Sequence, residues 1–144
     1  MAILCIGVAA ALLLVLSEVT NLVEVDVTGA GCEDAVADPD TADRCELTGG
    51  EQHSFALVPI AFLCGVMAVG AGLGASRPAA FALLIAGLLV LGIALIGDLP
   101  ETSDTGQVGT TFANAEANPG IGFWFELAAG VLAVAAGALR LRPL

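Results

Sequence analysis

Two uncharged apolar runs dominate the middle of the chain, at residues 55–75 and 79–97, and only Ser76, Arg77 and Pro78 separate them. Each run has about the length that an α-helix needs to cross a bilayer. Because the linker is so short, the runs are predicted to form an antiparallel helical hairpin. Arg77 lies in its turn, and short loops that carry Arg stay on the cytoplasmic side of a membrane. We therefore expect a membrane hairpin whose turn faces the cytoplasm.

Apolar runs at residues 2–18 and 121–139 predict two further spans. The composition agrees with a multi-pass membrane protein, since 58% of the 144 residues are hydrophobic and the mean hydropathy is +0.94. The expected fold is an all-α membrane protein, one four-transmembrane-helix bundle over residues 1–144 with polar loops at 19–54 and 98–120. The first run is short for a crossing, so either its helix continues past Glu18 or residues precede it in the native protein.

Charge is distributed unevenly along the chain, with fifteen acidic residues, four basic ones and a net charge of −11. Arg77, Arg140 and Arg142 lie at one predicted membrane face, whereas most acidic residues lie in the two polar loops. By the positive-inside rule, both termini are expected in the cytoplasm and both loops outside the plasma membrane. The acidity excludes a nucleic-acid partner, which would need a basic surface. The expected partner is the lipid bilayer.

The polar loops carry weaker signals for secondary structure. Residues 21–28 alternate valine with polar residues, which predicts a half-buried strand. Residues 44–48 are a candidate partner strand. Asp98 and Pro100 are expected to end the third helix, because proline cannot continue one. Residues 111–117 are expected to form a short surface helix.

The first polar loop contains Cys32 and Cys45, which are predicted to form a disulfide because thiols outside the cytoplasm oxidise. Closing this loop is worth about 3 kcal/mol in chain entropy. Redox catalysis is the alternative. Four-helix disulfide-generating membrane enzymes are similar in helix number, but they need a reactive CxxC pair, which this sequence lacks. Cys5 and Cys64 lie inside predicted spans and are expected to be packing residues.

Asp38, Asp40 and Asp43 form a candidate weak cation site in the same loop. An EF-hand that began at Asp38 would need Gly at its sixth position and Glu at its twelfth, where the chain has Asp43 and Gly49. A solvated acidic loop is therefore the favoured interpretation. His53 is the only histidine, and without further His or free loop Cys it predicts no zinc site. No metal and no cofactor are expected.

Glu126 is the one ionisable residue well inside a predicted span, and Glu18 lies at the end of another. Carboxylates within a membrane are functional candidates, so both residues are candidates for a pore or a ligand site. Alternatively, each side chain reaches the outer headgroups or hydrogen-bonds to a neighbouring helix. Trp124 is expected to anchor the outer interface, as Arg77, Arg140 and Arg142 anchor the inner one.

Small residues recur along the predicted spans at the spacing that lets helix backbones approach closely. This helix-packing set includes Gly65, Gly72, Gly130 and Gly137. Packing inside the four-helix bundle needs most of these residues. Some are nevertheless expected to face neighbouring subunits.

The outline of four spans, a cysteine-paired outer loop with strand character and a short inner turn resembles the claudin-like tetraspan proteins. The claudin signature, a Trp and a Gly-Leu-Trp upstream of the loop cysteines, is absent, since the only Trp is Trp124. The resemblance implies that Cys32 and Cys45 fix a β-rich outer loop and that the protein assembles side by side.

Two functions are consistent with this pattern. The chain is expected to be a non-enzymatic membrane protein that self-assembles into a homo-oligomeric, pore-like or structural assembly with acidic outer loops. Alternatively, it is an accessory subunit of a larger transporter, respiratory or envelope complex. An enzyme is not expected, because the sequence contains no nucleophile–base pair, metal set or phosphate loop.

Overall fold

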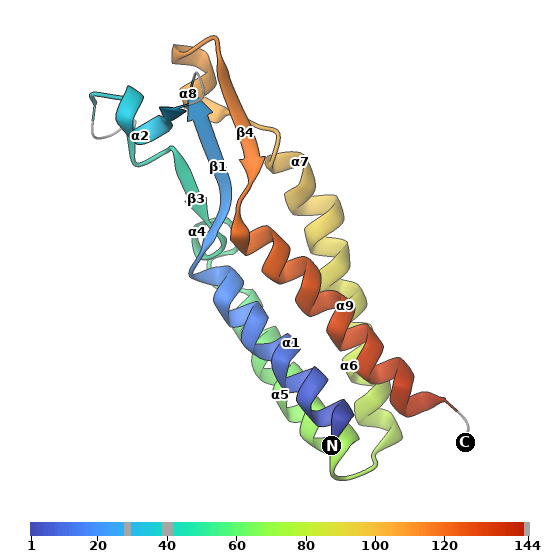
Figure 1. The fold of residues 1–144 in the computed structure, drawn as a ribbon. Coiled ribbons are helices and arrows are strands. Elements are labelled where there is room, and N and C mark those ends of the chain that lie inside the picture. The colour runs from blue at the N-terminus through green and yellow to red at the C-terminus, as the bar shows by residue number, and fades with distance from the viewer. Residues whose placement is uncertain (28–29, 39–41, 143–144) are drawn as a thin grey trace.

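The computed structural model describes residues 1–27, 30–38 and 42–142. Four helices lie side by side, with a small sheet beyond one end of them (Figure 1). These helices are α1 (Ala2–Glu18), α5 (Leu57–Gly72), α6 (Arg77–Gly92) and α9 (Ile121–Leu141). Helix α1 packs between α5 and α9, and α6 packs between the same two helices. Met1, the α5–α6 turn and the end of α9 lie at the end away from the sheet.

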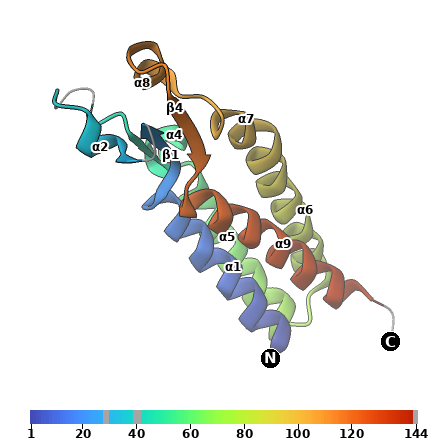
Figure 2. The same ribbon diagram turned by 45° about the horizontal axis from the view of Figure 1, so that its top comes forward.

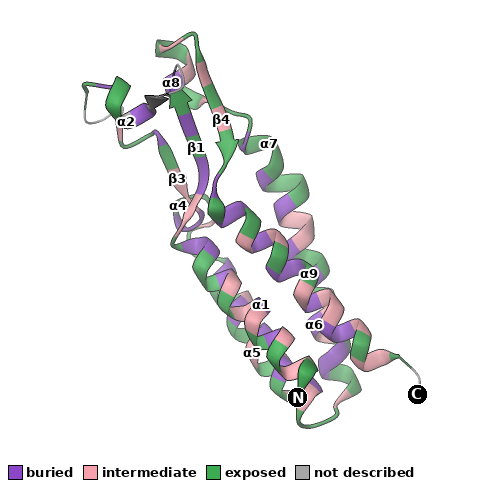
Figure 3. Cartoon of the chain, viewed as in Figure 1, coloured by how far each residue is buried: buried purple, intermediate pink, exposed green. Residues whose placement is uncertain are grey.

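The helices enclose a core of small and branched apolar residues. Ala10, Leu14, Cys64, Leu83 and Ala133 are buried at its centre. Many residues elsewhere on these helices are exposed (Figure 3). Many of these exposed side chains are large and apolar, among them Leu12, Phe62, Leu89 and Val131. The outer surface of the helices is therefore largely hydrophobic.

The prediction of a four-transmembrane-helix bundle is wrong. In the described residues, two helical segments are long and apolar enough to cross a membrane, Arg77–Thr111 and Ile121–Leu141. Helices α1 and α5 have 17 and 16 residues, which correspond to about 26 Å and 24 Å of helix against a hydrocarbon thickness of about 30 Å.

Helix α5 is shorter than its apolar run because the run also supplies the flanking turns. Ser54 and Phe55 adopt left-handed backbone conformations, with φ of 51° and 59°, so the helix begins only at Leu57. At the other end, Gly72 ends the helix and Ala75, with φ of 51°, belongs to the turn. A run without charges therefore overestimates the length of the helix it contains.

The third apolar helix continues past the predicted stop at Asp98 and Pro100. Helix α6 passes directly into a π-helical segment, η1 (Ile93–Asp98), and then into α7 (Leu99–Glu101). Pro100 lies in the first turn of α7, where the fixed φ of proline is compatible with a helix. A π-helical turn shifts the phase of the residues that follow it, and here it ends at the buried Asp98.

The sheet joins both polar loops around one central strand, β1 (Asn21–Val27). The predicted strand is confirmed, and its buried valines face a core that includes Val36 and Val108. Antiparallel to β1 lie β4 (Ala115–Pro119) on one edge and β3 (Glu46–Thr48) with β2 (Ala30–Gly31) on the other. The predicted partner strand therefore exists in shortened form as β3. Because β1 follows α1 and β4 precedes α9, the sheet extends two helices (Figure 2).

The predicted surface helix at residues 111–117 is wrong. Helix α8 (Gly106–Thr111) ends where that helix was expected to begin, and β4 follows it. Ala115 and Ala117 pack against the sheet core, whereas Glu116 and Asn118 are exposed, which is the alternation of a strand. Pairing with β1 provides the backbone hydrogen bonds for a sequence of low intrinsic strand propensity.

The Cys32–Cys45 disulfide is confirmed, with 5.6 Å between the two Cα atoms. It joins α2 (Cys32–Ala35) to the residue before β3, and both cysteines are buried in the sheet core. Helix α4 (Gly49–His53) follows β3 directly. Thr48 and Glu51 form a capping box at its start, and the hydrogen bonds from Thr48 lower the pKa of Glu51.

Most of the predicted helix-packing glycines are used within the chain. A Cβ at Gly72 would lie 2.8 Å from the Leu4 Cβ, and one at Gly130 would lie 2.8 Å from the Leu91 Cγ. At Gly137 it would lie 2.7 Å from the Ala80 carbonyl oxygen, whereas at Gly65 the nearest atom is 3.9 Å away. Glycine therefore sets the close approach of α1 to α5 and of α6 to α9.

We expect Gly137→Ala to lower the free energy of unfolding by about 1–3 kcal/mol, because the new methyl group meets the backbone of α6. Gly92→Ala is the matched control, since no described atom lies within 4 Å of its Cβ position. Helix propensity predicts that this control is neutral or stabilising by up to about 1 kcal/mol. Thermal unfolding in mild detergent compares the two. Equal melting temperatures would contradict the packing argument.

Candidate functional site

Four ionisable side chains meet where the helices join the sheet. Glu18 is the last residue of α1, His53 the last of α4, Asp98 the last of η1, and Glu126 lies in the second turn of α9. The three acidic residues are buried, with exposed fractions of 1%, 1% and 0%, and the His53 side chain is 12% exposed. These four residues are called the carboxylate–histidine cluster below.

Two glycines allow α4 to carry His53 to the cluster. A Cβ on Gly49 would clash with the carbonyl oxygen of Ser17, and one on Gly50 would lie 2.9 Å from the carbonyl oxygen of Glu18. Only a residue without a side chain allows α4 to pack so closely against the end of α1. This contact brings the last residue of α4 beside the last residue of α1.

Glu18 is held in place by the start of α5. Its Oε1 atom accepts a hydrogen bond of 2.8 Å from the backbone N–H of Leu57, the first residue of that helix. The Ala56 side chain cannot cap α5, so the carboxylate of Glu18 satisfies one of the N–H groups that a helix N-terminus leaves unpaired. The negative charge also lies at the positive end of the α5 dipole. One oxygen of Glu18 thus has a structural role, and Oε2 is left for the cluster.

His53 and Asp98 form the ion pair of the cluster. Nε2 of His53 lies 2.9 Å from Oδ1 of Asp98. The hydrogen bond from Asp98 raises the pKa of His53, and the charges of Asp98 and Glu18 raise it further, although burial of the ring opposes the shift. The ring therefore binds a proton more readily than a free imidazole does.

Glu126 completes a compact set of donor atoms. One donor atom each from His53, Asp98 and Glu126 can be chosen so that all three lie within 4.8 Å of one another. Among the described residues, no N–H or O–H group donates to the Glu126 carboxylate, to Oδ2 of Asp98 or to Oε2 of Glu18. The carboxyl groups of Glu126 and Asp98 lie close enough to share a hydrogen bond when one of them is protonated. Buried carboxylate oxygens without partners are rare, because each loses its hydration without compensation.

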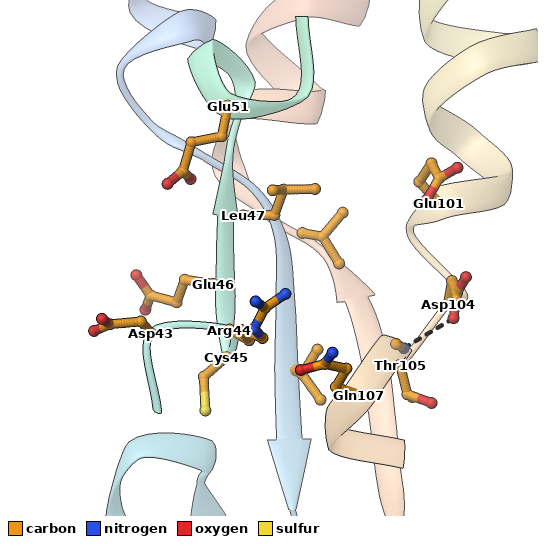
Figure 4. A pocket seen from close by; sticks show the side chains of 13 residues that line it. Asp43, Arg44, Cys45, Glu46, Leu47, Glu51, Glu101, Asp104, Thr105 and Gln107 are labelled. Carbon is orange, nitrogen blue, oxygen red and sulfur yellow. Dashed lines mark hydrogen bonds between the residues drawn. The ribbon is translucent and has the colours of Figure 1, made fainter. Parts of the chain in front are cut away.

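An acidic cleft of about 710 Å³ lies in the sheet region, lined by parts of β1 and β3 and by the α7–α8 segment. Figure 4 shows its labelled acidic side chains on two sides: Asp43, Glu46 and Glu51 on one, Glu101 and Asp104 on the other, with Arg44 between them. Helix α4 contributes a residue to both the cleft and the carboxylate–histidine cluster. Glu101 of the cleft lies in α7, which directly follows Asp98 of the cluster.

Sequence reasoning found half of the cluster. Glu18 and Glu126 were predicted as polar residues within the helices, and the fold brings both to the same site. Asp98 was interpreted only as a helix stop, and His53 was expected to form no zinc site. The signals that could have found them are an acid at the end of an apolar run and the only histidine of the chain.

The remaining predicted site residues lie elsewhere. Asp43 lines the acidic cleft, the carbonyl of Asp38 accepts a hydrogen bond from the N–H of Ala42, and Asp40 lies outside the described residues. Trp124 is 51% exposed and contacts the Phe123 ring edge-on. Arg77 begins α6, Arg140 donates to the Ala75 carbonyl, and Arg142 caps α9, all at the end away from the sheet.

Because His53 is the only histidine, its imidazole signal can be followed by NMR without ambiguity. With a chelator present, so that only protons compete for the ring, we expect a titration midpoint above the ordinary value of about 6.5. The stabilisation from the pair is then complete below that ordinary value and is lost as the pH rises through the raised midpoint. Asp98→Asn should lower the midpoint, and an unchanged midpoint would contradict the pairing.

Comparison with family models, with curated proteins and with solved structures finds no match to this chain. The claudin-like resemblance therefore stays a prediction from the outline of the sequence. The function must be argued from the carboxylate–histidine cluster and its surroundings.

Proposed function

We propose that this chain is a non-enzymatic membrane protein that binds a cation in the carboxylate–histidine cluster. The observation that carries the proposal is the set of buried carboxylate oxygens on Glu18, Asp98 and Glu126 that have no hydrogen-bond partner among the described residues. Moving a carboxylate out of water costs several kcal/mol unless an opposite charge compensates it. His53 can compensate only one of the three. A bound cation would supply the missing positive charge.

No other side chain in the described part of the chain is placed to provide this charge. The chain has no lysine, and within the described residues the ion pair between His53 and Asp98 is the only one. Arg77, Arg140 and Arg142 lie at the opposite end of the helices, and Arg44 is an exposed residue of the acidic cleft. A cation from solution is therefore the available counter-charge.

The proposed membrane placement uses the two helical segments that are long enough to cross. In this arrangement two segments cross the bilayer antiparallel to each other, one formed by α6 and η1 and the other by α9. The exposed apolar side chains of the helices contact lipid. The acidic sheet then lies outside the cell. Arg77, Arg140 and Arg142 then lie on the cytoplasmic side, in accord with the positive-inside rule.

This placement puts the cluster near the outer end of the spanning segments and the acidic cleft on the external side. A cleft lined by five acidic residues and one arginine raises the local concentration of cations by its electrostatic potential. Because α4 contributes Glu51 to the cleft and His53 to the cluster, cations collected outside would arrive next to the site.

Lateral assembly is a second candidate role, either with further copies or with a larger complex. Gly72, Gly130 and Gly137 pack against helices of the same chain and therefore do not support lateral assembly. A groove of about 470 Å³ between α1 and α5 favours it, since apolar residues such as Leu12, Phe62 and Val66 line the groove on two short helices. Sizing in mild detergent should give a discrete oligomer, and a lone chain would contradict self-assembly.

The proposed function predicts that a cation stabilises the folded protein. A ligand present at 100 times its dissociation constant adds about 2.7 kcal/mol, which for a chain of this size raises the melting temperature by about 5–10 °C. Thermal unfolding should be measured after chelation and then with Na⁺, K⁺, Mg²⁺, Ca²⁺, Mn²⁺ or Zn²⁺. At least one of these ions should raise the melting temperature of the natural protein.

Glu126→Gln should abolish this rise, because it removes the charge of a buried carboxylate and keeps its shape. Glu24→Gln is the matched control, since Glu24 is an exposed residue of β1 and its replacement makes the same change in charge. If none of the cations stabilises the natural protein, or if both variants lose the effect equally, the proposed function is wrong.

A further inference from the structure

We infer that the cation is a divalent transition-metal ion of the Mn²⁺, Fe²⁺ or Zn²⁺ class, held by His53, Asp98 and Glu126 with Glu18 beside them. This inference rests on the proposed function and identifies the class of ion that the cluster takes. In this inference the imidazole of His53 is a ligand of the metal ion.

The geometry requires little movement. Metal–ligand bonds of about 2.0–2.2 Å place neighbouring donor atoms about 3–4 Å apart. Here the three donor atoms already lie within 4.8 Å of one another. Small side-chain rotations would bring them to bonding positions. Glu126 is fully buried and both of its oxygens lack partners among the described residues, so it is free to coordinate through one oxygen or both.

The charge balance favours a divalent ion. Ligands coordinate in their deprotonated forms, so Glu18, Asp98 and Glu126 with a neutral imidazole carry three negative charges. A monovalent ion would leave two of these charges buried without compensation, and a divalent ion would leave one. Oε1 of Glu18 also accepts a hydrogen bond from the Leu57 N–H, which disperses part of the remaining charge.

The imidazole distinguishes between divalent ions. Ca²⁺ prefers six to eight oxygen ligands, and Mg²⁺ keeps several of its waters. Carboxylate oxygen suits Mg²⁺, Ca²⁺ and Mn²⁺ alike, whereas imidazole nitrogen suits Zn²⁺ and Fe²⁺, so the nitrogen ligand is what discriminates against Ca²⁺ and Mg²⁺. A set of one nitrogen and two or three carboxylates therefore selects borderline transition metals over Ca²⁺ and Mg²⁺.

The ligands come from elements that are otherwise linked mainly by apolar packing. The π-helical segment η1 ends in Asp98, α4 ends in His53, and α9 carries Glu126. π-Helical turns occur frequently at functional sites, because the phase shift aims a side chain that a regular helix would direct elsewhere. A metal ion here would link η1, at the end of α6, and α9 to α4, which directly follows strand β3 of the sheet.

The first experiment measures selectivity on the full chain, purified with a tag that contains no histidine. After chelation, the protein is dialysed against equal concentrations of Mn²⁺, Zn²⁺, Ca²⁺ and Mg²⁺, and bound metal is measured by mass spectrometry. We expect about one Mn²⁺ or Zn²⁺ per chain. Loss of an outer-shell partner weakens metal sites 10–100-fold, so Glu126→Gln should weaken binding by about 100-fold or more. Glu24→Gln should leave it unchanged.

The second experiment identifies the ligand in the natural protein. Pulsed electron paramagnetic resonance of bound Mn²⁺ detects coupling to an imidazole nitrogen, and His53 is the only imidazole in the chain. We expect this coupling in the natural protein and its loss in His53→Gln. Should either variant fail to fold, the coupling in the natural protein still decides the question.

The outcomes separate this inference from the proposed function. Binding of Na⁺, K⁺, Mg²⁺ or Ca²⁺ in preference to the transition metals, or bound Mn²⁺ without nitrogen coupling, overturns the inference and leaves the proposed function standing. If no cation binds to the natural protein, both are overturned.

Discussion

Three carboxylates are buried together where the helices meet the sheet, and a single imidazole compensates only one of them. Charges of the same sign in a medium of low polarity repel strongly, so Glu18, Asp98 and Glu126 cannot all stay ionised at this position without additional positive charge. The apolar packing of this region depends on how that charge is provided. Leu22, Val23, Ala94 and Phe123 form a small core where strand β1 meets α9 and η1.

The backbone geometry around the cluster is built to place these side chains. Gly49 and Gly50 let α4 pack against the end of α1, and Glu18 caps the first turn of α5. The π-helical segment ends at Asp98, and α9 places Glu126 in its second turn. Four separate elements therefore converge on one point. If these acids served only to stabilise the protein, apolar residues of similar size would do so at lower cost in free energy.

Local sequence patterns predicted the local features. Alternating valines predicted β1, the two loop cysteines predicted the disulfide, and uncharged runs predicted four apolar helices. The lengths of those helices were not predictable from composition. Ser54, Phe55 and Ala75 have left-handed conformations that shorten α5, and such conformations depend on how the turn packs. The four-transmembrane-helix fold failed because α1 and α5 are both shorter than a bilayer crossing.

The cluster itself was beyond sequence patterns because its residues lie far apart in the chain. Glu18 and Glu126 were recognisable as acids in apolar surroundings, but their proximity depends on how α1 packs against α9. Asp98 was misinterpreted, because Pro100 two residues later indicated the end of a helix. In the structure, η1 continues into α7 at this point. Strand β4 was missed because its pairing with β1 outweighs the weak strand propensity of its own residues.

The central claim is that a cation, and not a set of shared protons, balances the buried carboxylates. An experimental structure of the protein prepared with Mn²⁺, with anomalous scattering data collected at the manganese edge, tests it most directly. The account predicts one anomalous peak between His53, Asp98 and Glu126, at about 2.0–2.3 Å from the nearest donor atoms. Carboxylates that hydrogen-bond directly to one another at this position, with no peak between them, would contradict it.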